Sequence, residues 1–168
     1  MRMLTLATVA AFAVAPAALA ETYRTHPEAS VQVTVGPQLM KKAKTTYGVR
    51  EVERLAAELQ ADVAREIART GIMAGGKVEL VLVDAKPNRP TLKQMSDRPG
   101  LSYQSFGVGG AKIEGQLVSM DGQVTPVSYK WYETDISQAW PKTTWFDAQW
   151  TFDRFAGRLA RGQRLASR

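Results

Sequence analysis

One histidine and several acidic residues are the side chains that could support catalysis. His26 is the only histidine, it precedes Pro27, and the chain contains no cysteine. Zinc and other transition metals are normally held by several His and Cys ligands. A Ser-His-Asp arrangement would have to use His26, and the sequence has no G-x-S-x-G motif to present a nucleophilic serine. We therefore expect no metal site, no cofactor and no nucleophilic triad.

Paired carboxylates are the remaining catalytic option. Two acids at a fixed spacing across a glycosidic bond can hydrolyse it. The acids near predicted strand ends or in loops are Asp84, Asp97, Glu114, Asp121, Glu133 and Asp135. The sequence alone does not decide whether any two of them lie at that spacing. A small envelope glycan or lipid hydrolase is therefore the alternative hypothesis, and a non-catalytic binding protein is the leading one.

A long polar segment, residues 85–104, follows the most apolar strand of the chain. Loops of this length are uncommon in compact domains and are often functional. Its three prolines restrict its conformations. We predict a site for an anionic ligand here, formed by Lys86, Asn88, Arg89, Lys93 and Arg98. The alternative is that Leu92, Met95 and Leu101 pack the segment over an open face of the sheet, covering Val81 and Val83.

Two aromatic residues lie away from the apolar stripe of the last predicted helix. Phe146 and Trp150 are four residues apart, so they are neighbours on a helix surface. Exposed aromatic pairs can anchor a protein partner or stack on sugars. We therefore predict that this pair binds a partner. The alternative is that residues 137–143 or the N-terminal segment fold over it.

The periodicity of apolar residues predicts the elements that position these candidates. A helix over residues 49–70 has its apolar side chains at spacings of three and four, and Gly71 suits a left-handed C-cap. Residues 78–84 form an apolar run with strand composition, typical of an interior strand covered on both faces. Residues 31–35 alternate as a half-buried strand, and the intervening helix favours parallel pairing of the two strands.

A hairpin follows, with strands over about residues 106–118 and 123–134. A three-residue loop with Gly122 left-handed pairs Ser119 with Gln123 and keeps one apolar face on each strand. The predicted cross-strand pairs are then Ala111 with Trp131, Ile113 with Tyr129, and Gly115 with Val127. Pro126 cannot donate a ladder hydrogen bond, so the second strand of the hairpin belongs at a sheet edge.

A second helix over residues 145–160 completes the domain, and Thr144 with Asp147 resembles a capping box at its start. The order is β-α-β-β-β-α. We predict an α+β fold with a single mixed four-stranded sheet and two helices packed on one face.

The first twenty residues have the pattern of a cleaved secretory signal peptide. Arg2 is followed by an apolar stretch, and Ala18-Leu19-Ala20 is a small-residue cleavage site. We expect cleavage after Ala20, a periplasmic location, and no transmembrane helix in the mature protein. Residues 21–168 form one domain, with residues 21–29 and 161–168 expected to be flexible. The formal net charge of +6 permits an anionic partner such as lipid or glycan, or an envelope protein, and we expect no nucleic acid.

Three stretches together resemble a group of known sequences. They are the leucine- and alanine-rich helix, Gly-Gly-Lys-Val-Glu-Leu-Val-Leu-Val-Asp (75–84), and Gly-Gly-Ala-Lys-Ile-Glu-Gly-Gln-Leu-Val (109–118) followed by Asp-Gly-Gln-Val (121–124). This layout resembles small exported proteobacterial proteins catalogued as domains of unknown function. The resemblance covers most of the chain after the signal, and it implies a fold without supplying catalytic residues.

Overall fold

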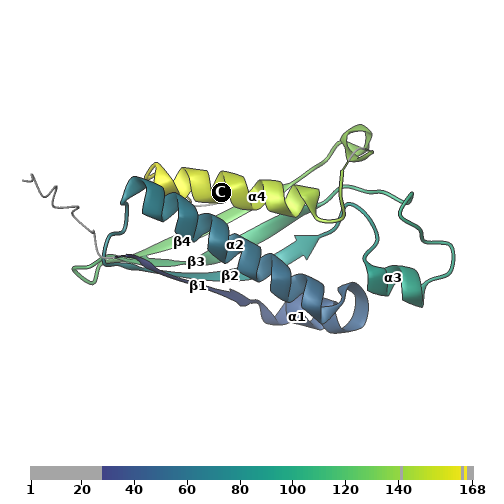
Figure 1. The fold of residues 1–168 in the computed structure, drawn as a ribbon, viewed down its shortest axis with the longest axis horizontal. Helices are drawn as coiled ribbons and strands as arrows, with labels where there is room; N and C mark the ends of the chain where they lie inside the picture. Colours follow the sequence, from purple (N-terminus) through teal and green to yellow (C-terminus); the bar gives the residue numbers. More distant parts are fainter. Residues whose placement is uncertain (1–27, 141, 164, 166–168) are drawn as a thin grey trace, which may run out of the picture.

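The computed structural model describes residues 28–140, 142–163 and 165. The predicted signal segment and its cleavage site lie outside these residues. The described chain forms one four-stranded sheet with helices, in the predicted α+β class (Figure 1). Within this part of the chain, no helix is long and apolar enough to cross a membrane.

The sheet contains β1 (Ser30–Val35), β2 (Lys77–Lys86), β3 (Gly110–Val118) and β4 (Val124–Tyr132), in that spatial order. β1 runs parallel to β2, and the other two pairings are antiparallel. The apolar strand β2 is therefore interior, as the sequence predicts. Val78, Leu80 and Leu82 of β2 are buried under the helices, which follows from the alternation of side chains along a strand.

The hairpin confirms the predicted register. Ala111 lies opposite Trp131, Ile113 opposite Tyr129, and Gly115 opposite Val127. Gly122 has φ 84°, and the Ser119 amide donates to the Gln123 carbonyl over 3.0 Å. β4 is the edge strand that Pro126 requires. β3 begins later than predicted, at Gly110, so Phe106 lies in the preceding loop.

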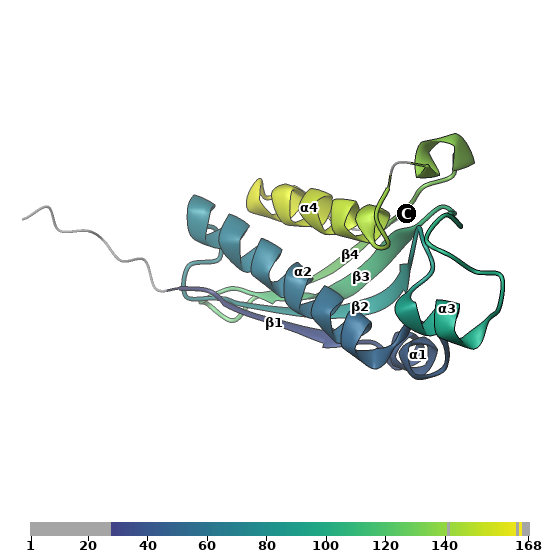
Figure 2. The same ribbon diagram turned by 45° about the vertical axis from the view of Figure 1, so that its right-hand side comes forward.

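Helices α2 (Val49–Thr70) and α4 (Phe146–Ala160) cover the same face of the sheet (Figures 1 and 2). The apolar stripe of α2 is buried from Val52 to Ile67, and Gly71 ends the helix with φ 69°. Phe152 and Phe155 of α4 are fully buried in the same core. This arrangement confirms the predicted two-layer packing.

Short helices occur where the sequence predicted only connections. α1 (Pro37–Lys42) starts with proline at its first position and continues into a π-helical turn over Ala43–Tyr47. α3 (Leu92–Asp97) lies within the long polar segment, and a 3₁₀ turn spans Ile136–Ala139. Such short helices have little apolar periodicity, so a pattern search does not detect them.

The capping box at Thr144 and Asp147 was wrong. Trp145 is the N-cap residue of α4 and makes no side-chain cap. The Asp147 carboxylate accepts hydrogen bonds from Asn88 and Gly109, which lie outside the helix. A capping box forms instead at α3, where Thr91 and Gln94 exchange hydrogen bonds.

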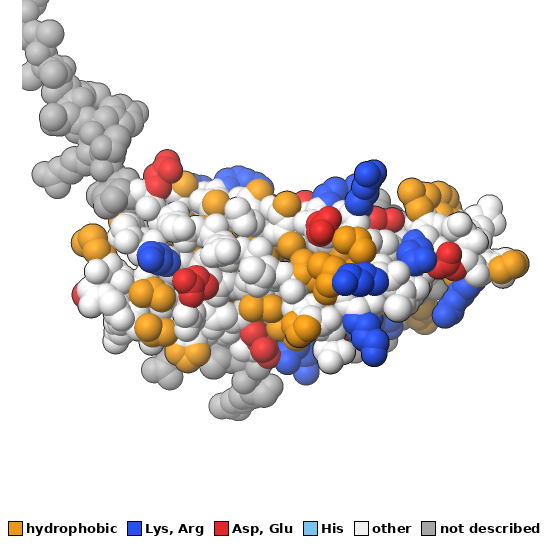
Figure 3. Space-filling model, turned by 90° about the horizontal axis from the view of Figure 1, so that it is seen from below, with side chains coloured by type: hydrophobic (Ala, Val, Ile, Leu, Met, Phe, Trp, Pro, Cys, Tyr) orange, Lys and Arg blue, Asp and Glu red, His pale blue; other side chains and the backbone are white. Residues whose placement is uncertain are grey.

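Neither α2 nor α4 covers the other face of the sheet (Figure 3 looks onto this face). It holds a hollow of about 820 Å³ with Val81 and Val83 in its lining, formed by the strands themselves and by residues 36–38. No residue of the 85–104 segment lines it. The alternative in which this segment covers Val81 and Val83 was therefore wrong; the segment extends from the end of β2, beside α1 and the start of α2 (Figure 2).

Candidate binding surface

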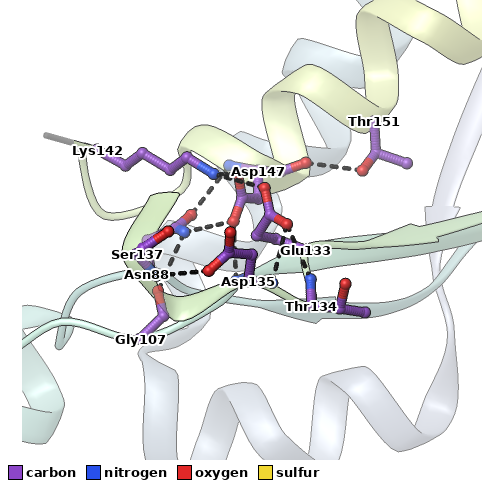
Figure 4. Close-up of polar contacts among 10 residues, drawn as sticks. Asn88, Gly107, Glu133, Thr134, Asp135, Ser137, Lys142, Asp147 and Thr151 are labelled. Atoms are coloured by element: carbon purple, nitrogen blue, oxygen red, sulfur yellow. Dashed lines mark hydrogen bonds and ion pairs between the residues drawn. The ribbon is translucent and has the colours of Figure 1, made fainter. Parts of the chain in front are cut away.

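Asn88 and Asp147 form the centre of a buried polar network at the end of the sheet (Figure 4). The Asn88 amide nitrogen donates to one Asp147 carboxylate oxygen over 2.5 Å, and the backbone amide of Asp147 donates to the Asn88 side-chain oxygen over 2.9 Å. The Gly109 amide donates to the same carboxylate oxygen over 2.9 Å. A buried carboxylate persists only when it is paired in this way.

Lys142 supplies the positive charge of the network. Its amine lies 2.8 Å from the second Asp147 oxygen and 3.1 Å from the Glu133 carboxylate (Figure 4). Burial alone would lower the pKa of Lys142, but hydrogen bonds to Asp147 and Glu133 outweigh it, and the pKa is raised. The lysine therefore stays charged at neutral pH and neutralises its neighbours.

The Glu133 carboxylate is held by two neighbouring backbone amides as well as by Lys142. The amides of Thr134 and Asp135 donate to one of its oxygens over 2.9 and 3.1 Å. The Asp135 amide is the main cause of the lowered pKa of Glu133, and the Lys142 amine adds to it. Glu133 and Lys142 thus keep their charges at neutral pH and form an ion pair that holds the segments together.

Arg89 joins the same segments from the other side. Its guanidinium donates to the backbone carbonyls of Lys142, Tyr103 and Trp140. The guanidinium has a rigid, planar set of donors, which suits three acceptors on two separate loops. Arg89 therefore fixes the loop before β3 to the loop before α4.

The two loops present large apolar side chains to solvent at one end of the molecule. Trp140 is 61% exposed and Tyr103 is 58% exposed. Phe106 packs edge-on against Trp140 with ring centroids 5.5 Å apart, and Arg89 lies over the Trp140 ring. Together with the exposed Leu92 and Ile136, these residues define what we call the loop-end surface: Leu92, Tyr103, Phe106, Ile136 and Trp140.

The residues predicted to bind an anion have different structural positions. Asn88 is buried in the network, and Arg89 holds the loops. Lys93 pairs with Asp97 over 2.7 Å, across one turn of α3. Lys86 and Arg98 are exposed. The structure thus does not gather all five around one point, and their binding of a ligand stays a prediction.

The aromatic pair on α4 is exposed, as its positions off the apolar stripe indicate. Phe146 is 41% exposed and Trp150 is 44% exposed. The Lys142 amine lies over the Phe146 ring and the Arg154 guanidinium over the Trp150 ring. The described residues 137–140 and 142–143 therefore do not bury this pair. Whether the pair binds a partner stays a prediction.

A second polar cluster lies where β2 has a bulge between Leu82 and Asp84. The Lys42 amine and the Tyr132 hydroxyl each lie 2.7 Å from the Asp84 carboxylate. Burial raises the pKa of Asp84, but the hydrogen bonds from Lys42 and Tyr132 outweigh it, so the pKa is lowered. Burial and the bond to Asp84 raise the pKa of the Tyr132 hydroxyl. The cluster stabilises ordinary charge states and supplies no group poised to exchange protons near neutral pH.

The acids considered for a hydrolase are engaged in local contacts. Asp84 binds Lys42, Asp97 binds Lys93, and Glu114 pairs with Lys112 over 2.7 Å. Asp121 accepts from the Gln123 amide, and Asp135 from the Ser137 amide. In the described part of the chain, no group of three or more His, Cys, Asp or Glu is placed to hold a metal ion.

Sequence reasoning missed the buried network and the contact between Phe106 and Trp140. Asn88, Lys142 and Asp147 have no recognisable spacing, since their contacts span up to 59 residues. The clustering of aromatic residues between Tyr129 and Phe155 was visible in the sequence. Phe106 lies outside that cluster, and only the paired loops bring it to Trp140.

Comparisons with known proteins leave the family open. No family model matches the sequence, so none supports the resemblance to domains of unknown function. No curated protein matches it either. A crystal structure of a minor lipoprotein from Acinetobacter baumannii aligns with 81% of this chain and 91% of that chain, at 9% identity and a TM-score of 0.36. Similarity this low carries no functional conclusion.

Proposed function

We propose that this protein is an exported, periplasmic, non-catalytic binding module that attaches to a component of the cell envelope through the loop-end surface. The observation that carries the proposal is the exposure of Tyr103 and Trp140 on loops held by Arg89 and by the buried Asn88–Asp147 pair. Exposed aromatic side chains on rigid supports are typical contact residues, because little conformational entropy is lost on binding.

The export part of the proposal is supported by the sequence of residues 1–20, which has the three regions of a signal peptide. The non-catalytic part is supported by the candidate acids, which are engaged in contacts with neighbouring side chains and amides. Lys86, Arg98 and the pair Phe146 and Trp150 are proposed as additional contact residues, since all four are exposed.

The test is affinity purification from the native envelope, with mass spectrometry of proteins and lipids together. The wild-type chain is compared with a Tyr103→Ala/Trp140→Ala variant. The matched control is Met120→Ala/Val124→Ala, which removes exposed apolar side chains from the β3–β4 hairpin at the opposite end of the molecule (Figure 1).

We expect the wild type and the control to recover the same component, and the loop-end variant to lose it. Equal recovery by all three proteins would refute the loop-end surface as the contact site. Determining the N-terminal residue of the recovered protein tests export: a terminus at Glu21 supports cleavage after Ala20, and a retained Met1 contradicts it.

A further inference from the structure

The positive charge of the protein is concentrated at the end that carries the loop-end surface. Segments 37–54, 86–109 and 133–147 contain ten Lys and Arg against six Asp and Glu. The other described segments contain eight Lys and Arg against nine Asp and Glu. Seen from the uncovered face of the sheet, Lys and Arg side chains gather toward the same end (Figure 3). The charge excess and the exposed apolar residues therefore coincide.

The basic side chains come from several elements around the apolar ones. Arg50 and Arg54 of α2 line a hollow of about 380 Å³ together with Leu92 and Tyr103 of the long loop, and Glu51 is the one acid among the described residues of its lining. Lys41 and Lys44 are exposed at the end of α1 and in the π-helical turn, which is in contact with α3. Arg98 is exposed just after α3. Cationic groups thus lie beside Leu92 and Tyr103 and next to α3.

Exposed aromatic and aliphatic side chains at an end with an excess of Lys and Arg match the chemistry of a membrane surface. Tryptophan and tyrosine prefer the level of the lipid headgroups, where one part of the ring is wet and the other apolar. Lys and Arg near the surface are attracted to anionic headgroups. From this match of charge and apolar groups, we propose that the loop end docks on the surface of an anionic lipid bilayer.

This inference rests on the proposed function and names the envelope component as lipid. The supports behind these side chains favour it, since Arg89 holds the Tyr103 and Trp140 carbonyls, and the buried Asn88–Asp147 network holds the two loops behind them. Side chains held in place lose little freedom when they enter the headgroup layer. The bilayer contact is peripheral, made by side chains at loop tips.

The test is co-sedimentation of the exported protein, purified from cells that express the full chain, with lipid vesicles. One set of vesicles contains phosphatidylglycerol and phosphatidylcholine in equal amounts, and the other contains phosphatidylcholine alone. The apolar variant is Tyr103→Ala/Trp140→Ala, with Met120→Ala/Val124→Ala as its control. The charge variant is Arg50→Gln/Arg98→Gln, with Lys77→Gln/Lys130→Gln as a control on exposed strand positions.

We expect the wild type to bind the anionic vesicles and not the neutral ones, with binding that weakens as salt is raised. Each arginine removed should reduce the partition coefficient about fivefold. The apolar variant should also bind more weakly, and both controls should match the wild type. Circular dichroism of each variant verifies that its fold is retained.

Equal binding to both vesicle types, or variants that bind like their controls, would overturn the lipid proposal. If the protein binds no vesicles but still captures an envelope protein through Tyr103 and Trp140, the lipid proposal fails and the proposed function stands. If neither vesicles nor an envelope component is bound, both fail.

Discussion

Asn88 and Asp147 exchange two hydrogen bonds across 59 residues of sequence, and both side chains are buried. Asn88 follows β2, and Asp147 lies in the first turn of α4, so the pair ties the long loop to the start of the last helix. The aromatic side chains of both loops therefore depend on this pair for their positions.

Replacing Asn88 tests that dependence. Asn88→Ala removes a donor to Asp147 and leaves the buried Asp147 amide without its acceptor, and each unsatisfied buried group costs about 1–3 kcal/mol. We expect the free energy of unfolding to fall by about 2–4 kcal/mol, measured by urea denaturation. Ser102→Ala, at an exposed position in the same loop, is the control and should change it little. Equal stability of the two variants would contradict the proposed role of the pair.

Arg89→Lys tests whether the guanidinium fork holds the loops. Lysine keeps the charge but cannot donate to three carbonyls on two loops at once. We expect faster amide exchange across residues 98–107 and 134–143, and a loss of about 1–3 kcal/mol in stability, since hydrogen bonds to charged groups are worth about 1.5–3 kcal/mol each. Arg98→Lys is the matched control. Unchanged exchange in the Arg89 variant would show that the loops are held by other contacts.

The Asp84 cluster predicts a pH-dependent contribution to stability. The pKa of Asp84 is lowered from its ordinary value of 3.8, since the bonds from Lys42 and Tyr132 outweigh burial. Its contribution is therefore present above pH 3.8 and is lost as the pH falls through the lower folded-state pKa. We expect Asp84→Asn to cost about 0.5–1 kcal/mol at pH 7, a value reduced by the exposure of Lys42.

Thermal unfolding of the wild type and Asp84→Asn from pH 2 to pH 7 measures this contribution. The difference between the two proteins should shrink at the acid end of the range. The pKa of Lys42 is raised from 10.5 in the folded protein. The stabilisation that the charged lysine contributes is therefore fully present below pH 10.5 and is lost as the pH rises through the folded-state pKa of Lys42. A constant difference from pH 2 to pH 7 would rule out ionised Asp84 as the source.

Gly115→Ala tests the close packing of the two central strands. A Cβ atom at Gly115 would lie 2.1 Å from the Glu79 carbonyl oxygen and 2.9 Å from the Leu80 Cα, both on the backbone of β2. Because backbone atoms in an interior strand cannot move aside without disturbing their hydrogen bonds, we expect a loss of about 1–3 kcal/mol in the free energy of unfolding. Gly107→Ala, where nothing lies within 4 Å, should be tolerated. If both variants unfold at the same urea concentration, the strands are less tightly packed than described.

The sequence by itself determined the sheet, its two covering helices and the register of the hairpin. These features follow from local periodicity: the stripe of α2, the alternation in β3 and β4, and the left-handed turn at Gly122 are each readable within a few residues. The exposure of Phe146 and Trp150 was predictable for the same reason, since their helical positions place them off the buried stripe.

Only the tertiary structure decided where the loops lie and which polar residues are buried. The sequence placed Asn88 and Arg89 among the candidate ligand-binding residues of a basic loop, and the structure shows that their donors meet acceptors that lie 14–59 residues away along the chain. Such contacts have no sequence period, because they arise where the ends of β2, β4 and α4 converge. The same convergence brings Phe106 to Trp140 and places Arg89 over the Trp140 ring, which is why the loop-end surface could be recognised only after the chain had folded.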